Sequence, residues 1–383
     1  MAALESKLQR AIAAKAKSTG MIFTATTLVN LRTVLEAVEN PVPMLLEGGT
    51  GVGKSSTIKL AAEIKGDEGV RLIRFNMSSR VTVDDLLGRV ILVNRGGVER
   101  PELVEQPFTI AFKNGYWLLL DEINLAPDSV LQAIEAALDT GVLRVRDPTS
   151  SSGSVIEYRL GQAGKSFRLF ATQNPNTGFF KGKREKLSAA FLSRFVPVIF
   201  TELPREELQQ VVSGRLAAGG LTSDASTGFD LASCASKMEQ LHHRFKELVA
   251  EPAGEAAAAG AGAGAAAAAT LPPFPPSEHL GYAEVSVRDL LKLAEAVAWY
   301  AKAPASDGGV STTAWAQLLR AKLADAVIAF EAWAVYGARF RTPQARSAVA
   351  AISNEASVVP YFPHAIQDTL LQLLPQWLLS YYL

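Results

Sequence analysis

One eight-residue stretch constrains the fold of this chain more than any other. Residues 48–55 read Gly-Gly-Thr-Gly-Val-Gly-Lys-Ser, the G-x-x-x-x-G-K-[ST] spacing of a phosphate-binding loop. A short apolar run, 42–46, precedes the loop, and residues 56–64 after it carry apolar side chains at helical spacing. Glycines let a backbone wrap phosphates, and the free N–H groups of a helix N-terminus attract negative charge. The stretch therefore predicts a strand, a phosphate-binding loop and a helix in succession.

The mechanism of such a loop predicts what its residues bind. We expect Lys54 to reach the β- and γ-phosphates of a nucleotide and the Ser55 hydroxyl to bind Mg²⁺. ATP and Mg²⁺ are therefore the predicted ligands. A dinucleotide-binding loop is disfavoured, because no G-x-G-x-x-G pattern fits these glycines. The other predicted nucleotide contacts are Gly48, Gly49, Thr50, Gly51, Val52, Gly53 and Ser56.

Two adjacent acids follow a second apolar run. Residues 116–120 read Tyr-Trp-Leu-Leu-Leu and lead directly into Asp121 and Glu122. The carboxyl ends of parallel strands open onto the edge of the sheet where nucleotides bind. We expect Asp121 to hold Mg²⁺ and Glu122 to polarise the attacking water. Adjacent acids elsewhere are commonly solvated surface charge, but their place at the end of a buried strand favours the functional interpretation.

Composition limits the class of protein and its partners. Hydrophobic residues make up 48% of the 383 residues and charged residues 20%, which is typical of a globular protein. Lys and Arg balance Asp and Glu at 38 each, which disfavours nucleic acid as a direct partner. One cysteine fits a reducing compartment, and no apolar run spans a bilayer. We therefore expect an intracellular protein, cytoplasmic or nuclear, with no membrane partner.

Changes in composition along the chain predict three segments. The first is an N-terminal lead-in helix, and the second is an α/β nucleotide-binding domain with two inserted hairpins. The third is a helical lid, interrupted by a flexible insertion rich in Ala, Gly and Pro that cannot pack a core. The predicted bounds are 1–20 for the lead-in helix, 21–200 for the domain, 88–112 and 142–160 for the hairpins, 201–383 for the lid and 251–276 for the insertion.

Four motifs together resemble a known family. They are 48–55, Leu-Leu-Leu-Asp-Glu-Ile-Asn-Leu-Ala at 118–126, Ala-Thr-Gln-Asn-Pro at 171–175 and Leu-Ser-Arg-Phe at 192–195. Their order is similar to that of AAA+ ATPases of the dynein-related and midasin-like group, with MoxR-like ATPases as nearby relatives. The resemblance implies an α/β fold: a parallel five-stranded sheet of order 5-1-4-3-2, flanked by helices, with a C-terminal all-helical lid.

The resemblance also implies roles for three polar residues. Asn174 corresponds to a sensor that helps orient the attacking water, although an asparagine before Pro175 also fits a turn at a strand end. Arg194 corresponds to an arginine finger that reaches the γ-phosphate of a neighbouring subunit. Its alternative is a surface arginine beside an apolar strand. Arg288 would be a second sensor in the lid, or a helix-start arginine paired with Glu284.

The predicted function is ATP binding and hydrolysis by an AAA+ module that remodels a protein or ribonucleoprotein assembly. Its predicted partners are other AAA+ modules or subunits in a ring, and the client assembly. The alternative is a nucleotide-dependent scaffold with little hydrolysis, part of a larger multi-module ring. The giant relatives carry several modules in one chain, whereas this sequence has one phosphate-binding loop. A nucleic-acid motor on the same core is disfavoured by the zero net charge.

Overall fold

The computed structural model divides into two compact units, which we describe separately. The first comprises Met1–Ala11 and Ala25–Glu202, and the second comprises Ile12–Thr24 and Leu203–Leu383. The structure describes residues 8–10, 12–14, 22–66, 69–146, 155–160, 167–174, 187–226, 228–250, 285–302 and 324–337.

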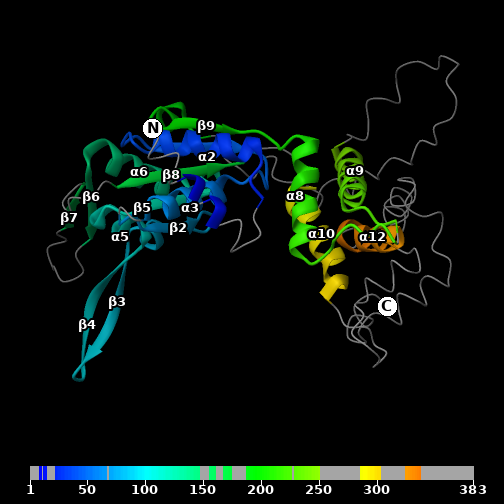
Figure 1. The fold of residues 1–383 in the computed structure, drawn as a ribbon. Helices are drawn as coiled ribbons and strands as arrows, with labels where there is room; N and C mark the ends of the chain where they lie inside the picture. Colours follow the sequence, from blue (N-terminus) through cyan, green and yellow to red (C-terminus); the bar gives the residue numbers. More distant parts are fainter. Residues whose placement is uncertain are drawn as a thin grey trace, which may run out of the picture. The chain divides into compact units, whose positions relative to one another are not determined.

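A five-stranded parallel sheet forms the centre of the first unit (Figure 1). Its order is β2-β5-β8-β1-β9, and every neighbouring pair is parallel. Numbered along the chain within this sheet, the order is 2-3-4-1-5, which is the predicted 5-1-4-3-2 viewed from the other end. The predicted fold class is therefore confirmed. The strands are β1 (Met44–Gly48), β2 (Leu72–Asn76), β5 (Trp117–Asp121), β8 (Arg168–Gln173) and β9 (Val196–Phe200).

Helices cover both faces of this sheet because its central strands are apolar on both sides. All five residues of β5 are buried, as expected of a strand in a covered parallel sheet. Alternate residues Leu118 and Leu120 join one core cluster with Phe108 and Phe112. The flanking helices are α2 (Ala25–Ala37), α3 (Lys54–Ile64), α5 (Pro107–Asn114), which carries those two phenylalanines, and α6 (Asp128–Thr140).

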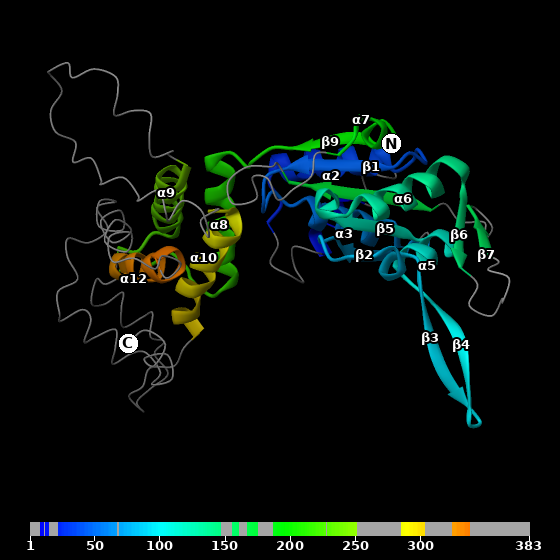
Figure 2. The ribbon, with the colours of Figure 1, turned by 180° about the vertical axis from the view of Figure 1, so that it is seen from behind.

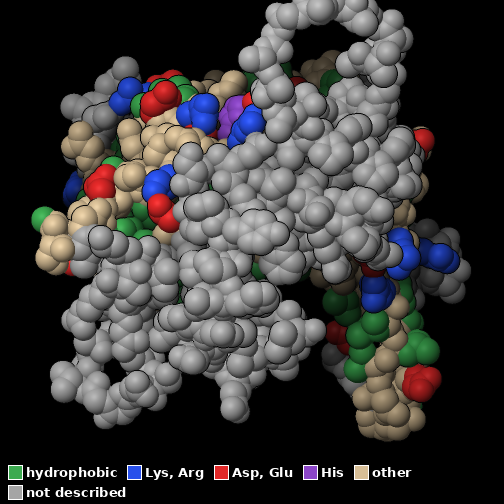
Figure 3. All heavy atoms as spheres, turned by 90° about the vertical axis from the view of Figure 1, so that its right-hand side faces the viewer, with side chains coloured by type: hydrophobic (Ala, Val, Ile, Leu, Met, Phe, Trp, Pro, Cys, Tyr) green, Lys and Arg blue, Asp and Glu red, His purple; other side chains and the backbone are tan. Residues whose placement is uncertain are grey.

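Two antiparallel hairpins are inserted between the strands of the sheet. Strands β3 (Gly88–Arg95) and β4 (Val98–Glu105) form an arm that projects from the first unit (Figures 1 and 2). Strands β6 (Val142–Arg146) and β7 (Val155–Arg159) form the second hairpin. Apolar and charged side chains lie side by side on the part of the described surface that projects at the lower right of Figure 3. The large hydrophobic side chains exposed on the arm are Val90, Ile91, Leu92, Val98 and Val104.

The first hairpin is shorter than the predicted span of 88–112, which is wrong at its C-terminal end. The hairpin ends at Glu105, and α5 begins two residues later. Proline is favourable at the first position of a helix, and Pro107 occupies it here. Phe108 and Phe112, four residues apart, then bury the same helical face in the core. The short helix α4 (Val83–Leu86) precedes β3.

The described part of the second unit is helical apart from its loops and one isolated bridge between Asp224 and Phe229, so the predicted all-helical lid is confirmed for those residues. Its core joins apolar residues of all four helices, among them Leu216, Leu241 and Leu293. The predicted insertion 251–276 lies outside the described residues, as does most of the predicted lead-in helix. The helices are α8 (Arg205–Ala218), α9 (Leu231–Ala250), α10 (Val287–Lys302) and α12 (Ala324–Ala332), the last followed by the π-helical turn Trp333–Gly337.

None of the helices that the structure describes is both long and apolar enough to cross a membrane.

Candidate functional site

The loop between β1 and α3 has the backbone geometry that its glycines predict. A Cβ atom on Gly48 would lie 2.3 Å from the carbonyl oxygen of Phe200 in the neighbouring strand β9, so only glycine fits there. Gly53 precedes α3 with φ of 92°, in the left-handed region that favours glycine. As a glycine it adds no side-chain cap to the first N–H groups of α3. These N–H groups can therefore receive an anion.

Lys54 lies inside this loop and joins it to the end of another strand. Its side chain is buried, and Nζ donates to the carbonyl oxygens of Gly48 and Gly49 at 2.7 and 2.8 Å. It also donates to Oδ1 of Asn174 at 2.6 Å, across 120 residues of sequence. The structure thus brings together Lys54 and the predicted sensor Asn174. An ammonium group has three donors, and these three oxygens can accept one each.

Asp121 gathers three donors at the carboxyl end of β5. Ser55 Oγ and Thr172 Oγ1 donate to Oδ1 at 2.7 and 2.6 Å, and Arg74 Nε donates to Oδ2 at 2.8 Å. Burial raises the pKa of Asp121. The hydrogen bonds from Thr172, Ser55 and Arg74, together with the charge of Arg74, outweigh burial and lower that pKa overall. Asp121 is therefore a carboxylate at neutral pH, next to the hydroxyl that was predicted to bind the same metal ion.

Glu122 has an unusual backbone conformation. Its φ of 57° makes it the one non-glycine residue with positive φ in the part of the chain that the structure describes. This left-handed conformation costs an ordinary residue about 1 kcal/mol or more, and it concentrates at functional sites. The backbone N–H of Glu122 donates to Thr172 Oγ1 at 3.0 Å. Thr172 therefore contacts both acids, accepting from the backbone of one and donating to the carboxylate of the other.

Sequence reasoning missed three residues of this edge. Thr172 and Arg74 bind Asp121, and Asn124 donates from Nδ2 to the backbone oxygen of Asn174 at 2.9 Å. Asn124 lies in the 3₁₀ turn Ile123–Leu125 after β5, and its buried Oδ1 has no hydrogen-bond partner among the described residues. The available signal was a polar residue in or beside an apolar strand, and that signal does not say which acid or backbone group the side chain meets.

The residues at this edge fit a magnesium–nucleotide complex. A carboxylate and a hydroxyl oxygen are ligands that Mg²⁺ accepts, and Asp121 and Ser55 supply them within hydrogen-bonding distance of each other. In the glycine loop, Gly48 has no room for a Cβ atom against β9, and Gly53 has a φ of 92° that favours glycine. Over the described residues there is no cluster of three or more His, Cys, Asp or Glu able to hold another metal ion. Of the remaining predicted contacts, Val52 is buried and Ser56 is exposed.

Arg194 lies at the opposite edge of the sheet. It follows the short helix α7 (Ala189–Leu192) and precedes β9, whose first residue Val196 pairs with Met44. The last residue of β9 pairs with Gly48 of the phosphate-binding loop. At about 3.3 Å per residue, a five-residue strand separates the two edges by about 16 Å. The structure therefore does not bring Arg194 together with Lys54, Asp121 or Glu122 of its own chain.

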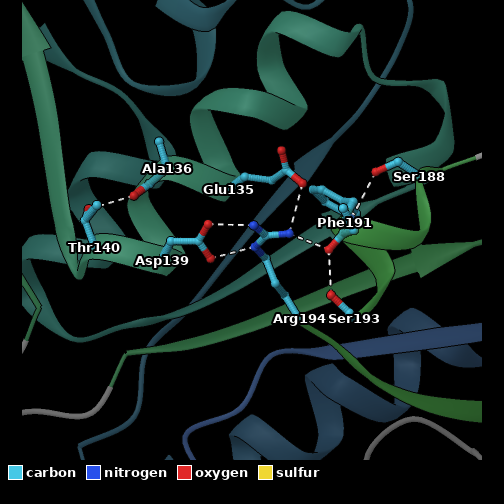
Figure 4. Close-up of polar contacts among 9 residues, drawn as sticks. Glu135, Ala136, Asp139, Thr140, Ser188, Phe191, Ser193 and Arg194 are labelled. Carbon is cyan, nitrogen blue, oxygen red and sulfur yellow. Dashed lines mark hydrogen bonds and ion pairs between the residues drawn. The ribbon is translucent and has the colours of Figure 1, made fainter.

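Two acids of α6 surround the Arg194 guanidinium (Figure 4). Nε and Nη2 donate to the two carboxylate oxygens of Asp139, each at 2.6 Å. Nη1 donates to Glu135 Oε1 at 3.1 Å and also to the backbone oxygen of Ala190. The hydrogen bond from Arg194 lowers the pKa of Asp139, and the same bond raises the pKa of Arg194. Arg194 and Asp139 also line a pocket of about 490 Å³ whose wall includes Phe112.

The last predicted site residue, Arg288, belongs to the second unit. It is exposed in the first turn of α10, next to the buried Asp289. Asp289, the third residue of α10, accepts hydrogen bonds from the backbone N–H and the hydroxyl of Ser286, as the acid of a capping box does. The role of Arg288 as a sensor stays a prediction.

Comparisons with known proteins find a domain match that lies within the first unit. Residues 43–195 match the AAA domain, dynein-related subfamily. The chain is 34% identical over 187 residues to midasin of Dictyostelium discoideum, covering 48% of this chain and 3% of that protein. It is 31% identical over 233 residues to midasin of Giardia intestinalis, covering 60% of this chain and 4% of that protein. It is 26% identical over 186 residues to the chaperone protein ClpB of Mycoplasma genitalium, covering 44% and 24%.

The match to the AAA domain covers the elements that build the nucleotide edge. The matched stretch begins one residue before β1 and ends one residue after Arg194, so it includes the loop, both acids, Asn174 and the arginine cluster. The chain spans only a few per cent of the length of the midasins that it matches. Together with the sheet order and the phosphate-binding loop, the matches show that residues 43–195 of this chain belong to the AAA family, in its dynein-related subfamily.

Proposed function

We propose that this chain binds ATP with Mg²⁺ at the carboxyl edge of its sheet and hydrolyses it as one module of a ring that remodels a protein or ribonucleoprotein assembly. One observation carries the proposal. Lys54, Ser55, Asp121 and Asn174 come from three separate strand ends and are joined by hydrogen bonds at a single loop. A glycine-rich turn with an incidental lysine would not need these partners.

Binding would exchange partners at Lys54 and Ser55. Lys54 now donates to two loop carbonyls, and phosphate oxygens are stronger, charged acceptors for the same ammonium group. The Ser55 hydroxyl now donates to Asp121 and would turn an oxygen lone pair toward the metal. Mg²⁺ held by Ser55 and Asp121 would neutralise charge on the β- and γ-phosphates.

Hydrolysis requires a base and an orienting group close to the bound phosphates. Glu122 follows Asp121 directly, and its left-handed backbone turns the chain at the end of β5. We propose that Glu122 accepts the proton of the attacking water and that Asn174 orients that water. The hydrogen bond from Lys54 to Asn174 supports this assignment, because it joins the second residue to the phosphate-binding lysine.

A neighbouring module completes the site in this proposal. Arg194 lies about 16 Å from the loop of its own chain, so its charge can serve only a nucleotide held elsewhere. An arginine supplied by a partner contributes about 10³- to 10⁵-fold in rate in related phosphoryl transfers. A ring of AAA+ modules places one module's arginine beside the next module's nucleotide. The likeness to a protein named as a chaperone supports remodelling as the use of this turnover.

ATP turnover measured against protein concentration, together with sizing in ATP, tests the proposal. We expect specific activity to rise with concentration and to fall by about 10³-fold or more in Arg194→Ala, with ATP affinity unchanged. Glu122→Gln should bind ATP normally but turn it over at least about 10²-fold more slowly. Equal turnover in Glu122→Gln and the parent would remove Glu122 as the base.

The alternative function has its own outcome in this experiment. Flat, negligible turnover with intact ATP binding would support a nucleotide-dependent scaffold whose partner modules are other proteins. Failure of the parent chain to bind ATP would contradict both functions. Lys59→Ala is a suitable control variant, because Lys59 is an exposed lysine on the same helix as Lys54.

A further inference from the structure

We propose that Asp139 and Glu135 hold Arg194 withdrawn from the anion that it serves in a neighbouring module, so that release of this arginine is a separate step before hydrolysis. The inference rests on the proposed function for the identity of that anion, the phosphates of a partner's nucleotide. The holding itself is a property of this chain and can be tested without turnover.

Most N–H donors of the Arg194 side chain are already used. A guanidinium group has five N–H donors in a rigid plane. In this structure Asp139 takes the Nε and Nη2 edge, and Glu135 and the backbone oxygen of Ala190 take both N–H groups of Nη1 (Figure 4). These contacts engage four of the five donors. The bidentate edge that would grip a phosphate is the one that Asp139 occupies.

The net charge of the cluster formed by Arg194, Asp139 and Glu135 also opposes an incoming anion. Two acidic side chains around one guanidinium give the cluster a formal net charge of −1. An approaching phosphate would be repelled by this cluster rather than attracted. Arg194 therefore cannot act as an anion receptor in the arrangement seen here, although it is the right residue type for one.

The two acids occupy unfavourable positions on their own helix, α6. Glu135 and Asp139 are four residues apart on α6, where like charges destabilise a helix. Asp139 also lies in the last turn of α6, where an acid interacts unfavourably with the helix dipole and no basic residue compensates it. Neither position suits an acid unless a cation binds both. Arg194 is that cation, and it comes from a different element of the fold.

The contact is also weak enough to be released. The side chain of Asp139 is 50% exposed, and those of Arg194 and Glu135 are 26% and 25% exposed. Water reaches ion pairs this close to the surface, so they are weaker than buried pairs. The bidentate geometry makes this contact one of the stronger surface pairs, but a competing anion can still replace the carboxylates. We therefore expect the carboxylates to reduce the exposed population of Arg194 by about two- to tenfold rather than to abolish it.

Chemical labelling of arginine tests the holding directly. Phenylglyoxal, which reacts with guanidinium nitrogens, is applied to the whole chain, and modification of Arg194 is quantified by mass spectrometry. We expect Asp139→Asn and Glu135→Gln each to raise the labelling rate of Arg194, by about two- to tenfold in the first variant. Asp128→Asn is the matched control, because it removes an exposed acid from the same helix at the end far from Arg194. An unchanged rate in Asp139→Asn, in a chain with the parent's melting temperature, would overturn the proposal.

Turnover then shows whether release limits hydrolysis. At protein concentrations where parent activity still rises, Asp139→Asn should increase turnover by about two- to tenfold with KM for ATP unchanged. The double variant Asp139→Asn/Arg194→Ala should fall to the level of Arg194→Ala. Lower or unchanged turnover in Asp139→Asn would mean that the acids position the arginine or have no effect, and it would overturn the proposal.

Failure of the proposed function gives a different result. If Arg194→Ala turns over ATP as the parent does, Arg194 serves no nucleotide, and the arginine part of the proposed function is wrong. Faster labelling in Asp139→Asn would in that case still show that the two acids withdraw Arg194.

Discussion

The two edges of the central sheet hold Lys54 and Arg194 in different ways. At the carboxyl edge Lys54 is bound by backbone carbonyls and an amide oxygen, which carry no full charge. At the amino edge Arg194 is bound by two carboxylates. A phosphate can replace neutral carbonyls on Lys54 with a gain of charge attraction, but at Arg194 it must first displace full negative charges. The first edge is ready to bind an anion, whereas the second becomes a receptor only after a change.

The largest effect that this comparison predicts is at Lys54. Lys54→Ala removes the buried ammonium group that three oxygens now share, and we expect ATP affinity to fall by about 10²-fold or more. Isothermal titration with ATP and Mg²⁺ measures this loss, with Lys59→Ala as the control expected to bind as the parent does. A loss below about threefold in Lys54→Ala would contradict the view that the carboxyl edge is a preformed phosphate site.

The next effect tests whether the loop geometry itself is required. Gly48→Ala places a Cβ atom 2.3 Å from the carbonyl oxygen of Phe200, so strand β9 must move away from β1. We expect the free energy of unfolding to fall by about 1–3 kcal/mol in a denaturant titration. Gly66→Ala is the matched control, because a Cβ atom there has no neighbour within 4 Å. Equal stability of the two variants would show that the loop adapts easily.

A smaller effect is predicted at Thr172, which joins the two acids. Thr172→Val keeps the shape of the side chain but leaves the backbone N–H of Glu122 without its acceptor and removes a donor from Asp121. We expect a loss of about 1–3 kcal/mol in stability, since Thr172 and Asp121 are buried and the N–H of Glu122 is partly buried. Thr172→Ser retains the hydroxyl and should recover most of that loss. Equal losses in the two variants would assign the effect to packing instead of hydrogen bonding.

The smallest predicted effect is the change in ATP affinity on replacing Arg194, and it tests whether the two edges are independent. Arg194→Ala should leave the dissociation constant of the chain for ATP within about twofold of the parent value, because the strand β9 separates this arginine from its own loop. The binding measurement is made at a protein concentration too low for assembly. A large loss of affinity under those conditions would mean that the two edges act on the same nucleotide.

Much of the carboxyl edge was predictable from the sequence because its parts are local. A glycine loop between an apolar strand and a helix determines its own geometry, so the positions of Lys54 and Ser55 follow from consecutive residues. Asp121 and Glu122 end an apolar strand, and the end of a buried parallel strand lies at the ligand edge. The C-terminal limit of the first hairpin was missed, because a proline that can end a strand also begins a helix.

The remaining contacts depend on packing between elements that are far apart in sequence. The register of β5 against β8 pairs Leu120 with Ala171, and this pairing is what brings the next residue, Thr172, beside Asp121. The placement of α6 beside the residues that follow α7 in the same way brings Asp139 to Arg194, across 55 residues of sequence. By itself the amino-acid sequence determined which residues gather at the phosphate-binding loop and at the end of β5, where we propose that phosphate and metal bind, since neighbours in the chain are neighbours in space. Only the tertiary structure decided which acids meet the arginine, because that depends on how separate elements pack.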